Sequence, residues 1–434
     1  MIKASSITDF AASDLGFGAA PWPCVRLKFA TTMITSGSRD WSQYFSTQGA
    51  PFVRITNLDR GRLSLRLDDL QTVSPPDEAE GERAQICQGD LLLSITAYLG
   101  SVGVATTSVL GGFVSQHIAL TRPDRKRFDS RWIGYCMLSD AGQDQLAGGA
   151  YGGTKVQLSL DDVRNLWFPT PPIHTQRAIA DYLDRETGRL DALVAAKKRW
   201  LELLAEKRCA LITRAVTRGL NPAAPLRDSG FPWLGQVPKH WRVERSKWLF
   251  KERDERIEND DGEMLTVSHI TGVTKRSEKD VNMFEAETTE GYKICLKGDL
   301  AINTLWAWMG AMGIAPCDGI VSPAYNVYTP GPDMDRGYVE ALVRMPLFAQ
   351  EIIRYSKGVW SSRLRLYPEG FFEAWLPVPP LAEQRAIVAH IATATAKLDG
   401  LRTAAERTIA LLKERRAALI AAAVTGKIQI PNKK

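Results

Sequence analysis

The chain has 434 residues and a mass of 48.1 kDa, which is long enough for two or three ordinary domains. Hydrophobic residues make up 44% and charged residues 24%, a balance that excludes a fibrous or wholly disordered protein. The formal net charge of +6 is mild, so it permits a nucleic-acid partner without requiring one.

The cysteines and the amino-terminal residues indicate where the protein works. Six cysteines are scattered without a Cys-x-x-Cys pair, which argues against a disulfide scaffold and against a thiolate zinc site. Residues 1–10 contain no apolar core, so we expect no secretory signal. Both features favour a protein of the reducing cytoplasm.

A run without charged side chains, apart from a possible charge on His117, extends from Leu91 to Thr121. Glycines, serines and threonines divide it into short β-branched segments, so it predicts buried strands and not a membrane helix. Similar patterns elsewhere predict globular regions of mixed α/β structure. The expected strands are 52–58, 90–96, 102–105 and 113–120, and the expected helices are 131–145 and 338–355.

An internal duplication organises the chain. Residues 167–220 align without a gap with residues 375–428, and about 24 of the 54 positions are identical. Weaker echoes precede each copy, such as Gly89-Asp90-Leu91 and Gly298-Asp299-Leu300. The chain is therefore predicted to be two copies of one unit, each a globular region followed by a long helix.

The two helices begin after Pro171-Pro172 and Pro379-Pro380, because proline suits a first helical turn. A helix over 173–218 would span roughly 69 Å at about 1.5 Å per residue. An apolar period near 3.5 residues predicts a coiled-coil seam, and matching seams suggest antiparallel packing of the two helices. The alternative is that each helix packs on its own globular region. The predicted seam comprises Leu183, Leu190, Val194, Leu201, Leu204, Leu211, Ile391, Leu398, Ile409, Leu412 and Leu419.

A search for catalytic or cofactor motifs finds none. The glycines at 148–153 are followed by Thr154-Lys155, whereas a phosphate-binding loop needs lysine directly after its second glycine. The five histidines are far apart and show no metal-ligand spacing. We therefore predict no catalytic residues, metal or cofactor in this chain, and two binding modules on a helical spacer.

The charge distribution restricts where nucleic acid would bind. The helical segments 173–219 and 381–428 carry a net charge of +8, which leaves −2 for the rest, so a DNA surface there must be a local patch. Arg, Lys and Gln side chains can reach base edges and phosphates. The alternative is that these residues belong to solvated loops. The candidates are Arg60, Arg62, Tyr151, Thr154, Lys155, Gln157, Lys275, Arg276, Lys357, Trp360, Ser361, Ser362, Arg363 and Arg365.

The sequence resembles the specificity (S) subunit of a type I restriction–modification enzyme over essentially its whole length. The resemblance rests on the Trp-x-Pro-x-Pro-Pro-x-x-x-Gln-Arg-Ala-Ile segments and on the Leu-Asp-x-Leu that follows each of them. It extends to the helix ends, the linker and the stretch before the first helix. These motifs lie at 152–163, 167–179, 190–193, 206–217, 231–250, 375–387, 398–401 and 414–425.

This resemblance implies that each globular region is a target recognition domain that reads half of a bipartite DNA site. The two regions differ strongly in sequence, which implies an asymmetric target. The paired helices would set the half-site spacing and bind modification methyltransferase subunits, two of them in such complexes, together with restriction subunits. Those partners would use S-adenosylmethionine, ATP and Mg²⁺. The implied segments are 1–172 (first recognition domain), 173–218 (first spacer helix), 219–230 (linker), 231–380 (second recognition domain), 381–428 (second spacer helix) and 429–434 (tail).

Two other classes of protein stay open from the residues alone. A tandem DNA-binding regulator without a methyltransferase would share both binding modules. A coiled-coil scaffold would share the helices but would show no salt-dependent DNA affinity. A stand-alone restriction enzyme would need a catalytic motif, and the sequence offers none.

Overall fold

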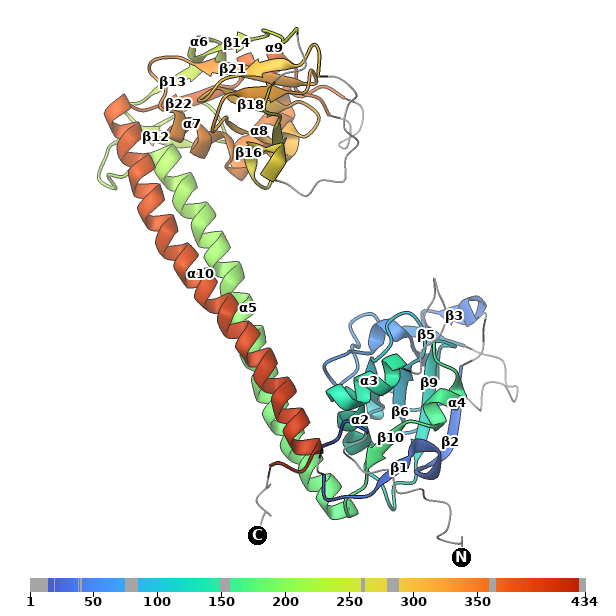
Figure 1. Cartoon of the computed structure of the whole chain (residues 1–434). Helices are drawn as coiled ribbons and strands as arrows, with labels where there is room; N and C mark the ends of the chain where they lie inside the picture. The colour runs from blue at the N-terminus through green and yellow to red at the C-terminus, as the bar shows by residue number, and fades with distance from the viewer. Residues whose placement is uncertain are drawn as a thin grey trace, which may run out of the picture. The chain divides into compact units, whose positions relative to one another are not determined.

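The computed structural model describes residues 15–18, 20–37, 39, 41–74, 85–148, 157–258, 262–278, 289–358 and 364–428. Contacts within the chain divide it into two units. Unit 1 combines Met1–Lys197 with Arg407–Lys434, and unit 2 is Lys198–Glu406. The boundary crosses both long helices, so each unit holds one end of each helix (Figure 1).

Unit 1 is built around a four-stranded antiparallel sheet of order β2-β9-β6-β7. The uncharged run at 91–121 supplies β6, β7 and most of β9, and nearly all side chains of these three strands are buried, as predicted. In the described part of the chain, no helix is long and apolar enough to cross a membrane. The strands are β2 (Thr31–Ser36), β6 (Leu91–Ser94), β7 (Val102–Val104) and β9 (Ile118–Pro123).

A second sheet in unit 1 has the order β3-β5-β4-β8, and β4 and β8 are parallel. The predicted strand at 52–58 is too long, because β4 ends at Val53. Asn57 Oδ1 accepts a hydrogen bond from the Arg54 N–H at 2.8 Å and closes a short 3₁₀ turn instead. The strands are β3 (Phe45–Ser46), β4 (Ala50–Val53), β5 (Gln71–Val73) and β8 (Phe113–Val114).

The helices of unit 1 pack around Trp132, Phe168 and other buried apolar side chains. The predicted single helix at 131–145 is wrong, since Ser139 divides it into two. The Ser139 hydroxyl donates to the Cys136 carbonyl at 2.6 Å, and the serine backbone is extended. Serine competes in this way with helical hydrogen bonding. The helices are α2 (Ser130–Leu138), α3 (Asp140–Gly148) and α4 (Leu160–Arg164).

Unit 2 repeats the main sheet of unit 1. Its strands have the antiparallel order β14-β21-β18-β19, which matches β2-β9-β6-β7 strand by strand. In both sheets, the first strand in the sequence lies at one edge and pairs with the last one. Two further strand pairs, β15–β16 and β17–β20, pack on this sheet. The strands are β14 (Phe250–Arg253), β15 (Leu265–Ser268), β16 (Gly272–Lys275), β17 (Lys293–Cys295), β18 (Leu300–Asn303), β19 (Met312–Ile314), β20 (Gly319–Val321) and β21 (Tyr325–Pro330).

The predicted helix at 338–355 is also two helices. Met345 has an extended backbone because the residue before a proline disfavours the helical conformation, and Pro346 then begins the next helix. Buried side chains of both helices join a core that includes Trp241, Tyr328 and Phe371. The helices of unit 2 are α6 (Ser246–Leu249), α7 (Arg336–Val343), α8 (Pro346–Tyr355) and α9 (Pro368–Glu373).

The repeated Trp-x-Pro segments form short antiparallel strands just before the long helices. In unit 1, β10 (Trp167–Pro169) pairs with β1 (Cys24–Arg26). In unit 2, β22 (Trp375–Val378) pairs with β13 (Arg242–Arg245), and β11 (Leu226–Asp228) pairs with β12 (Gln236–Pro238). Each repeated tryptophan carries an arginine over its ring, Arg26 on Trp167 at 4.9 Å and Arg245 on Trp375 at 5.8 Å.

The long helices are α5 (Ile173–Arg218) and α10 (Leu381–Val424) (Figure 1). In unit 1, the start of α5 packs with the end of α10, where Leu183 and Ile420 share one core. In unit 2, the end of α5 lies beside the start of α10, where Arg208 Nη1 pairs with Asp399 Oδ1 at 2.6 Å. The helices are therefore antiparallel in each unit. The predicted fold class, a duplicated mixed α/β chain with two long helices, is confirmed.

The second long helix is shorter than predicted, since it ends at Val424 and not at residue 428. Gly426 is left-handed, with φ +71°, and its N–H bonds the Ala423 carbonyl while the Lys427 N–H bonds the Ala422 carbonyl. These two bonds form the Schellman motif that ends many helices. A left-handed glycine, Gly219, likewise follows the end of α5.

Every residue of the predicted seam is withdrawn from solvent to some degree. The half-buried members are Leu201, Leu211, Ile391, Leu412 and Leu419. The fully buried members are Leu183, Leu190, Val194, Leu204, Leu398 and Ile409.

Candidate nucleic-acid interface

A buried glutamine fixes each globular region to the start of its long helix. In unit 1, Gln176 Oε1 accepts from the Asp129 N–H at 2.9 Å, and its Nε2 donates to the Pro171 carbonyl at 2.8 Å. Gln384 makes the same contacts in unit 2 with Asp335 at 2.8 Å and Pro379 at 2.9 Å. The glutamine of the repeated Gln-Arg-Ala-Ile motif therefore joins the start of α2 or α7 to the start of the long helix.

The two aspartates whose backbone N–H groups donate to these glutamines also begin helices. The side chain of Asp129 accepts hydrogen bonds from the first backbone N–H groups of α2, and Asp335 does so for α7. This capping satisfies N–H groups that have no partner inside the helix. Because the two caps are equivalent, Tyr135 of α2 corresponds to Ala341 of α7.

The repeated Gly-Asp-Leu motif is structural as well. Asp90 is buried and forms two hydrogen bonds with Arg122, at 2.8 and 2.9 Å. Asp299 is buried in the same way and accepts from Arg253 Nε at 2.8 Å. The hydrogen bond to Asp90 raises the pKa of Arg122 above its usual range.

Polar side chains attach α2 to the long helix in unit 1. Arg131 Nη1 lies 2.8 Å from both Asp181 and Asp184 on α5. The Tyr135 hydroxyl donates to Asp184 Oδ1 at 2.7 Å, and burial raises the pKa of this tyrosine. The helix α2 is therefore held on α5 by an ion-pair cluster and a buried aromatic ring.

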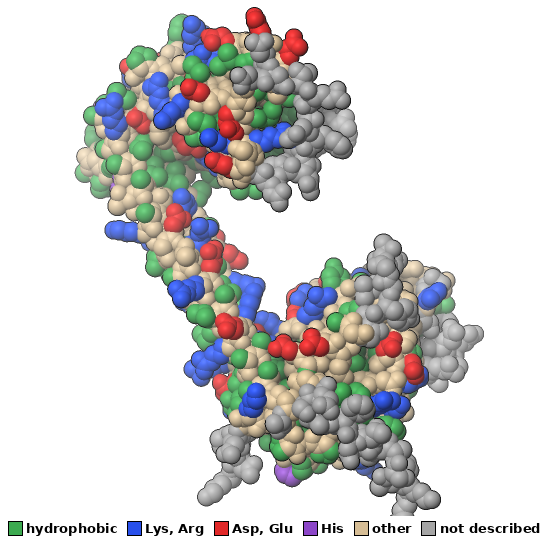
Figure 2. Space-filling view, in the orientation of Figure 1, with side chains coloured by type: hydrophobic (Ala, Val, Ile, Leu, Met, Phe, Trp, Pro, Cys, Tyr) green, Lys and Arg blue, Asp and Glu red, His purple; other side chains and the backbone are tan. Residues whose placement is uncertain are grey.

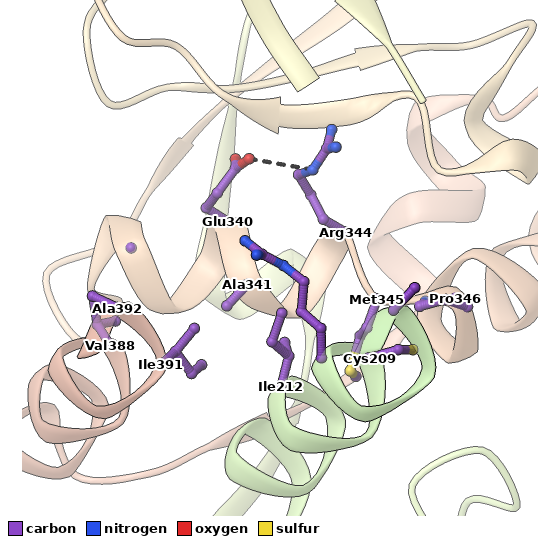
Figure 3. Close-up of a pocket in the computed structure, with 13 residues that line it drawn as sticks. Cys209, Ile212, Glu340, Ala341, Arg344, Met345, Pro346, Val388, Ile391 and Ala392 are labelled. Atoms are coloured by element: carbon purple, nitrogen blue, oxygen red, sulfur yellow. Dashed lines mark ion pairs between the residues drawn. The ribbon is translucent and has the colours of Figure 1, made fainter. Parts of the chain in front are cut away.

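Unit 2 has small residues at the equivalent positions, Gly337, Ala341 and Ala392, and a cavity of about 510 Å³ lies there. Figure 3 shows α7 above this cavity, with Val388 and Ile391 of α10 on one side and Ile212 of α5 below. At its upper edge, Glu340 Oε1 pairs with Arg344 Nε at 3.5 Å. Burial raises the pKa of Glu340, although hydrogen bonding from the Ile314 N–H opposes this.

The basic turns predicted as DNA contacts differ in how much their side chains contact the rest of the protein. Arg62 Nε pairs with Asp191 Oδ2 on α5 at 3.1 Å, and Arg60 is exposed in the same turn. In unit 2, Lys275 and Arg276 are half-buried at the end of β16, where Arg276 Nη1 lies 3.8 Å from Met264 Sδ. The contact of Arg62 with α5 holds its turn against the long helix.

The other predicted contacts come from the two segments that precede the Trp-x-Pro strands. Gln157 is exposed and forms a β-bridge with Thr96. Arg365 is exposed and exchanges two backbone hydrogen bonds with Lys357, each 2.9 Å long. Tyr151, Thr154, Lys155, Trp360, Ser361, Ser362 and Arg363 lie outside the described residues.

Both segments lie beside the turn that connects a central strand of the main sheet to the neighbouring edge strand, β6 to β7 in unit 1 and β18 to β19 in unit 2. In unit 1, the Leu158 N–H donates to the Ile95 carbonyl at 2.9 Å, just after β6. In unit 2, the Leu366 N–H donates to the Thr304 carbonyl at 3.0 Å, just after β18. Equivalent hydrogen bonds therefore bring Gln157 and Arg365 next to equivalent turns, here termed turn 1 (residues 95–101) and turn 2 (residues 304–311).

A third segment completes each site. The His117 carbonyl accepts from the Ile95 N–H at 3.0 Å, and His117 Nδ1 lies 2.8 Å from the Thr96 hydroxyl. In unit 2, the Thr304 hydroxyl donates to the Ala324 carbonyl at 2.8 Å. Each site is thus an assembly of three chain segments at one end of the main sheet. The buried Asp90 and Asp299 pairs lie at the opposite end, where β6 and β18 begin.

Both turns present aromatic side chains that are not among the candidates predicted from the sequence. Tyr98 of turn 1 is 59% exposed, and Trp306 of turn 2 is 49% exposed. Trp306 and Trp308 are stacked, with ring centroids 6.4 Å apart and an interplanar angle of 16°. The available signal was a pair of tryptophans directly after a short apolar strand, where a tight turn leaves large side chains in solvent.

The charges on the surface do not mark one binding face. On the face shown in Figure 2, Lys and Arg side chains are intermingled with Asp and Glu over both units. This agrees with the net charge of −2 outside the long helices. In the described part of the chain, no group of three or more His, Cys, Asp or Glu residues could hold a metal ion.

Searches against protein-family models and curated proteins find no match, but solved structures match nearly the whole chain. The HsdS subunit from Thermoanaerobacter tengcongensis is 18% identical, with a TM-score of 0.52, and the match covers 94% of this chain and 97% of that chain. A chain from a type I R-M system, studied for its complex assembly and conformational transition, is 19% identical. Its TM-score is 0.62, over 94% of this chain and 98% of that chain.

The chain has the HsdS fold. Both matches extend over the duplicated globular regions and the long helices, so the HsdS likeness belongs to the tandem architecture and not to one domain. The fold predicted from the resemblance is confirmed.

Proposed function

We propose that this chain is the DNA-recognition subunit of a type I restriction–modification complex. The observation that carries the proposal is the likeness to HsdS structures over 94% of the chain, with the internal duplication included. Each globular region would read one half of a bipartite DNA target. Since the two regions differ in sequence, the two half-sites would differ and the target would be asymmetric.

The three-segment sites support the assignment of DNA contacts. In each site, a turn with an exposed aromatic side chain lies next to a segment with basic or amide side chains. These side chains are Gln157 in unit 1 and Lys357 with Arg365 in unit 2. Arginine and glutamine are side chains that read guanine and adenine edges in the major groove. The candidate residues in these segments stay predictions.

Exposed leucines on the long helices support a partner protein. Leu193 and Leu203 of α5 are 44% and 45% exposed, and Leu401 and Leu411 of α10 are 44% and 55% exposed. Leu193 corresponds to Leu401 in the repeat, and Leu203 corresponds to Leu411. Each unit therefore presents one leucine from each helix. We infer that modification methyltransferase subunits, two per chain, dock on these surfaces.

Catalysis would belong to the partners. Modification subunits would bind S-adenosylmethionine and methylate adenine, and restriction subunits would use ATP and Mg²⁺ to translocate and cleave DNA. This chain would bind DNA weakly alone and would work in the cytoplasm. The long helices would fix the spacing between half-sites.

The test is a map of methylated adenines in cells with and without this gene. We expect one bipartite asymmetric motif that disappears with the gene and returns when the gene is restored. Exchange of residues 1–166 for the corresponding region of another such subunit serves as the control, and it should change one half-site only. Loss of the gene without any change in methylation would contradict the proposal and favour a regulator or a scaffold.

A further inference from the structure

We propose that turn 2 stacks on DNA, with the indole of Trp306 wedged against a base in the half-site that unit 2 reads. This inference rests on the proposed function and adds a base-stacking element to it. It concerns side chains that are not among the candidate DNA contacts predicted from the sequence.

The first argument is that the Trp306 ring is exposed and that its position is fixed by neighbouring groups before any ligand binds. The Trp308 Nε1–H donates to the Leu305 carbonyl at 3.0 Å, and its ring stacks on Trp306 at an interplanar angle of 16°. The Trp306 carbonyl accepts hydrogen bonds from the Met309 and Ala311 N–H groups at 3.0 and 3.1 Å. A ring fixed in this way loses little conformational freedom on binding, which favours affinity.

The second argument is that a single exposed aromatic side chain is ordinary, whereas this one has apolar neighbours. Leu305 is 41% exposed and Met309 is 36% exposed in the same turn. Together with Trp306 they form an exposed patch of three side chains, here termed the apolar knob. Apolar wedges of this kind enter base steps in DNA-bending proteins, and base–aromatic stacking does not depend on the identity of the base.

The third argument is the charge beside the turn. The Leu366 N–H donates a hydrogen bond to the Thr304 carbonyl at the start of turn 2. This contact brings the exposed Lys357 and Arg365, which form a β-bridge, next to the turn. Lys357 Nζ also lies 6.0 Å from the ring centroid of Tyr367, which is itself 41% exposed. Cations around the apolar knob suit an anionic partner with stacked bases, namely DNA, better than an apolar protein surface.

The fourth argument is that the duplication preserves the arrangement while the sequence around it changes. Turn 1 of unit 1 presents Tyr98, also well exposed, at the same place beside Gln157. The residue before it, Ala97, has a φ of +54° and is the only non-glycine residue in the described part of the chain with a positive φ. Such backbone strain is maintained at functional sites more often than elsewhere. Two diverged regions therefore project an aromatic ring from equivalent turns.

The experiment compares variants of the full chain, assembled with its modification subunits, on the duplex that the methylation map identifies. A 2-aminopurine probe is placed in turn at each position of the half-site read by unit 2. We expect Trp306→Ala to lower the affinity on the order of 10-fold at fixed salt. It should also abolish the fluorescence change of the probe at one position, whereas Trp306→Phe should keep most of both signals. The dependence of affinity on salt should stay unchanged, because no phosphate contact is lost.

Trp248→Ala is the matched control, because Trp248 is 73% exposed in the same unit but lies at the other end of the main sheet. Phe250 pairs with Pro330 there, whereas Asn303, just before turn 2, pairs with Tyr325 at the opposite end of β21. This control should bind DNA like the wild type. Thermal unfolding of each variant identifies any loss that comes from misfolding, and Trp306→Phe then carries the comparison.

Three outcomes would overturn the inference. Equal affinity and an equal probe signal for Trp306→Ala and the wild type would show that the ring does not touch bases. Weaker assembly with the modification subunits, at unchanged DNA affinity of the assembled complex, would make turn 2 a protein interface. A wild-type complex without any sequence-specific DNA binding would overturn the proposed function and this inference together.

Discussion

The side-chain oxygen of Gln384 accepts a hydrogen bond from the backbone N–H of Asp335 at 2.8 Å, and Gln384 is fully buried. The Nε2 group of this glutamine donates to the carbonyls of Pro379 and Asp333, so one side chain satisfies three backbone groups. The bond links the start of α10 to the start of α7 within unit 2. Gln176 repeats it in unit 1.

Gln384→Ala should lower the free energy of unfolding by about 1–3 kcal/mol, because it leaves buried backbone groups without partners. Chemical denaturation of the full chain measures this loss. The matched control is Gln350→Ala, since Gln350 is exposed on α8 and its truncation should be nearly neutral. Equal stability of the two variants would contradict the structural role of Gln384.

Tyr135 and Ala341 occupy equivalent places on α2 and α7, but only the tyrosine fills the space against the long helices. Tyr135→Ala should cost about 3–5 kcal/mol of unfolding free energy, as large-to-small core substitutions do. Ala341→Leu places apolar atoms into the 510 Å³ cavity and should stabilise by about 0.5–2 kcal/mol. Urea denaturation of both variants measures whether the free energy of unfolding falls for Tyr135→Ala and rises for Ala341→Leu. A destabilised Ala341→Leu would mean that the cavity cannot accept the side chain.

Stability should depend on pH through Glu340. Burial raises the pKa of this carboxyl in the folded state, so the folded state is penalised once the group ionises. The penalty is absent below the unfolded pKa, near 4.5, and grows as the pH rises through the folded value. Glu340→Gln should therefore be more stable than the wild type at neutral pH, and the difference should vanish in acid.

Thermal unfolding of Glu340→Gln between pH 4 and pH 7 tests this dependence. The matched control is Glu258→Gln at an exposed position of the same unit. A constant difference between Glu340→Gln and the wild type over the whole pH range would mean that ionisation of Glu340 is not the cause.

The exposed leucines of the long helices should matter for assembly and not for folding. In unit 2, Leu203→Arg combined with Leu401→Arg should strongly reduce co-purification with modification subunits, since two charges would be buried in an apolar contact. Leu226→Arg is the control, because Leu226 is 39% exposed in β11 and outside the long helices. Unchanged assembly of the double variant would move the docking surface elsewhere.

Lengthening both helices should change the spacer of the DNA target and nothing else. One heptad inserted after Lys197 in α5 and one after Glu406 in α10 adds about 10.5 Å. This equals about three base pairs at about 3.4 Å each. Methylation mapping should find the same two half-sites with a longer gap. A variant with one heptad in α5 only is the control, and it should lose methylation because the two seams no longer match.

The sequence by itself determined the repeat, the two long helices and their seam. The buried face of a helix appears in the sequence as apolar residues that recur every three or four positions. Leu183, Leu190 and Val194 could therefore be recognised without any knowledge of their partners. The predicted end of the second helix lies four residues beyond Val424, because the left-handed Gly426 ends α10 with a motif that commonly terminates helices.

Two predicted helices, 131–145 and 338–355, are each interrupted by a single residue. Ser139 interrupts one helix through its own hydroxyl, and Met345 interrupts the other because Pro346 follows it. Apolar residues continue across both breaks, since both halves of each pair face the core. A continuous apolar pattern therefore predicted one helix where the chain makes two.

Only the tertiary structure decided which groups the candidate residues contact. It paired Arg62 with Asp191, which are far apart in the sequence, and it paired the buried Asp90 of the first Gly-Asp-Leu motif with Arg122. It also brought turn 2 next to Arg365, through a hydrogen bond between Leu366 and Thr304. Such contacts join strands and turns whose sequence spacing carries no period, so an exposed ring such as Trp306 becomes recognisable as part of a site only after the sheet has formed.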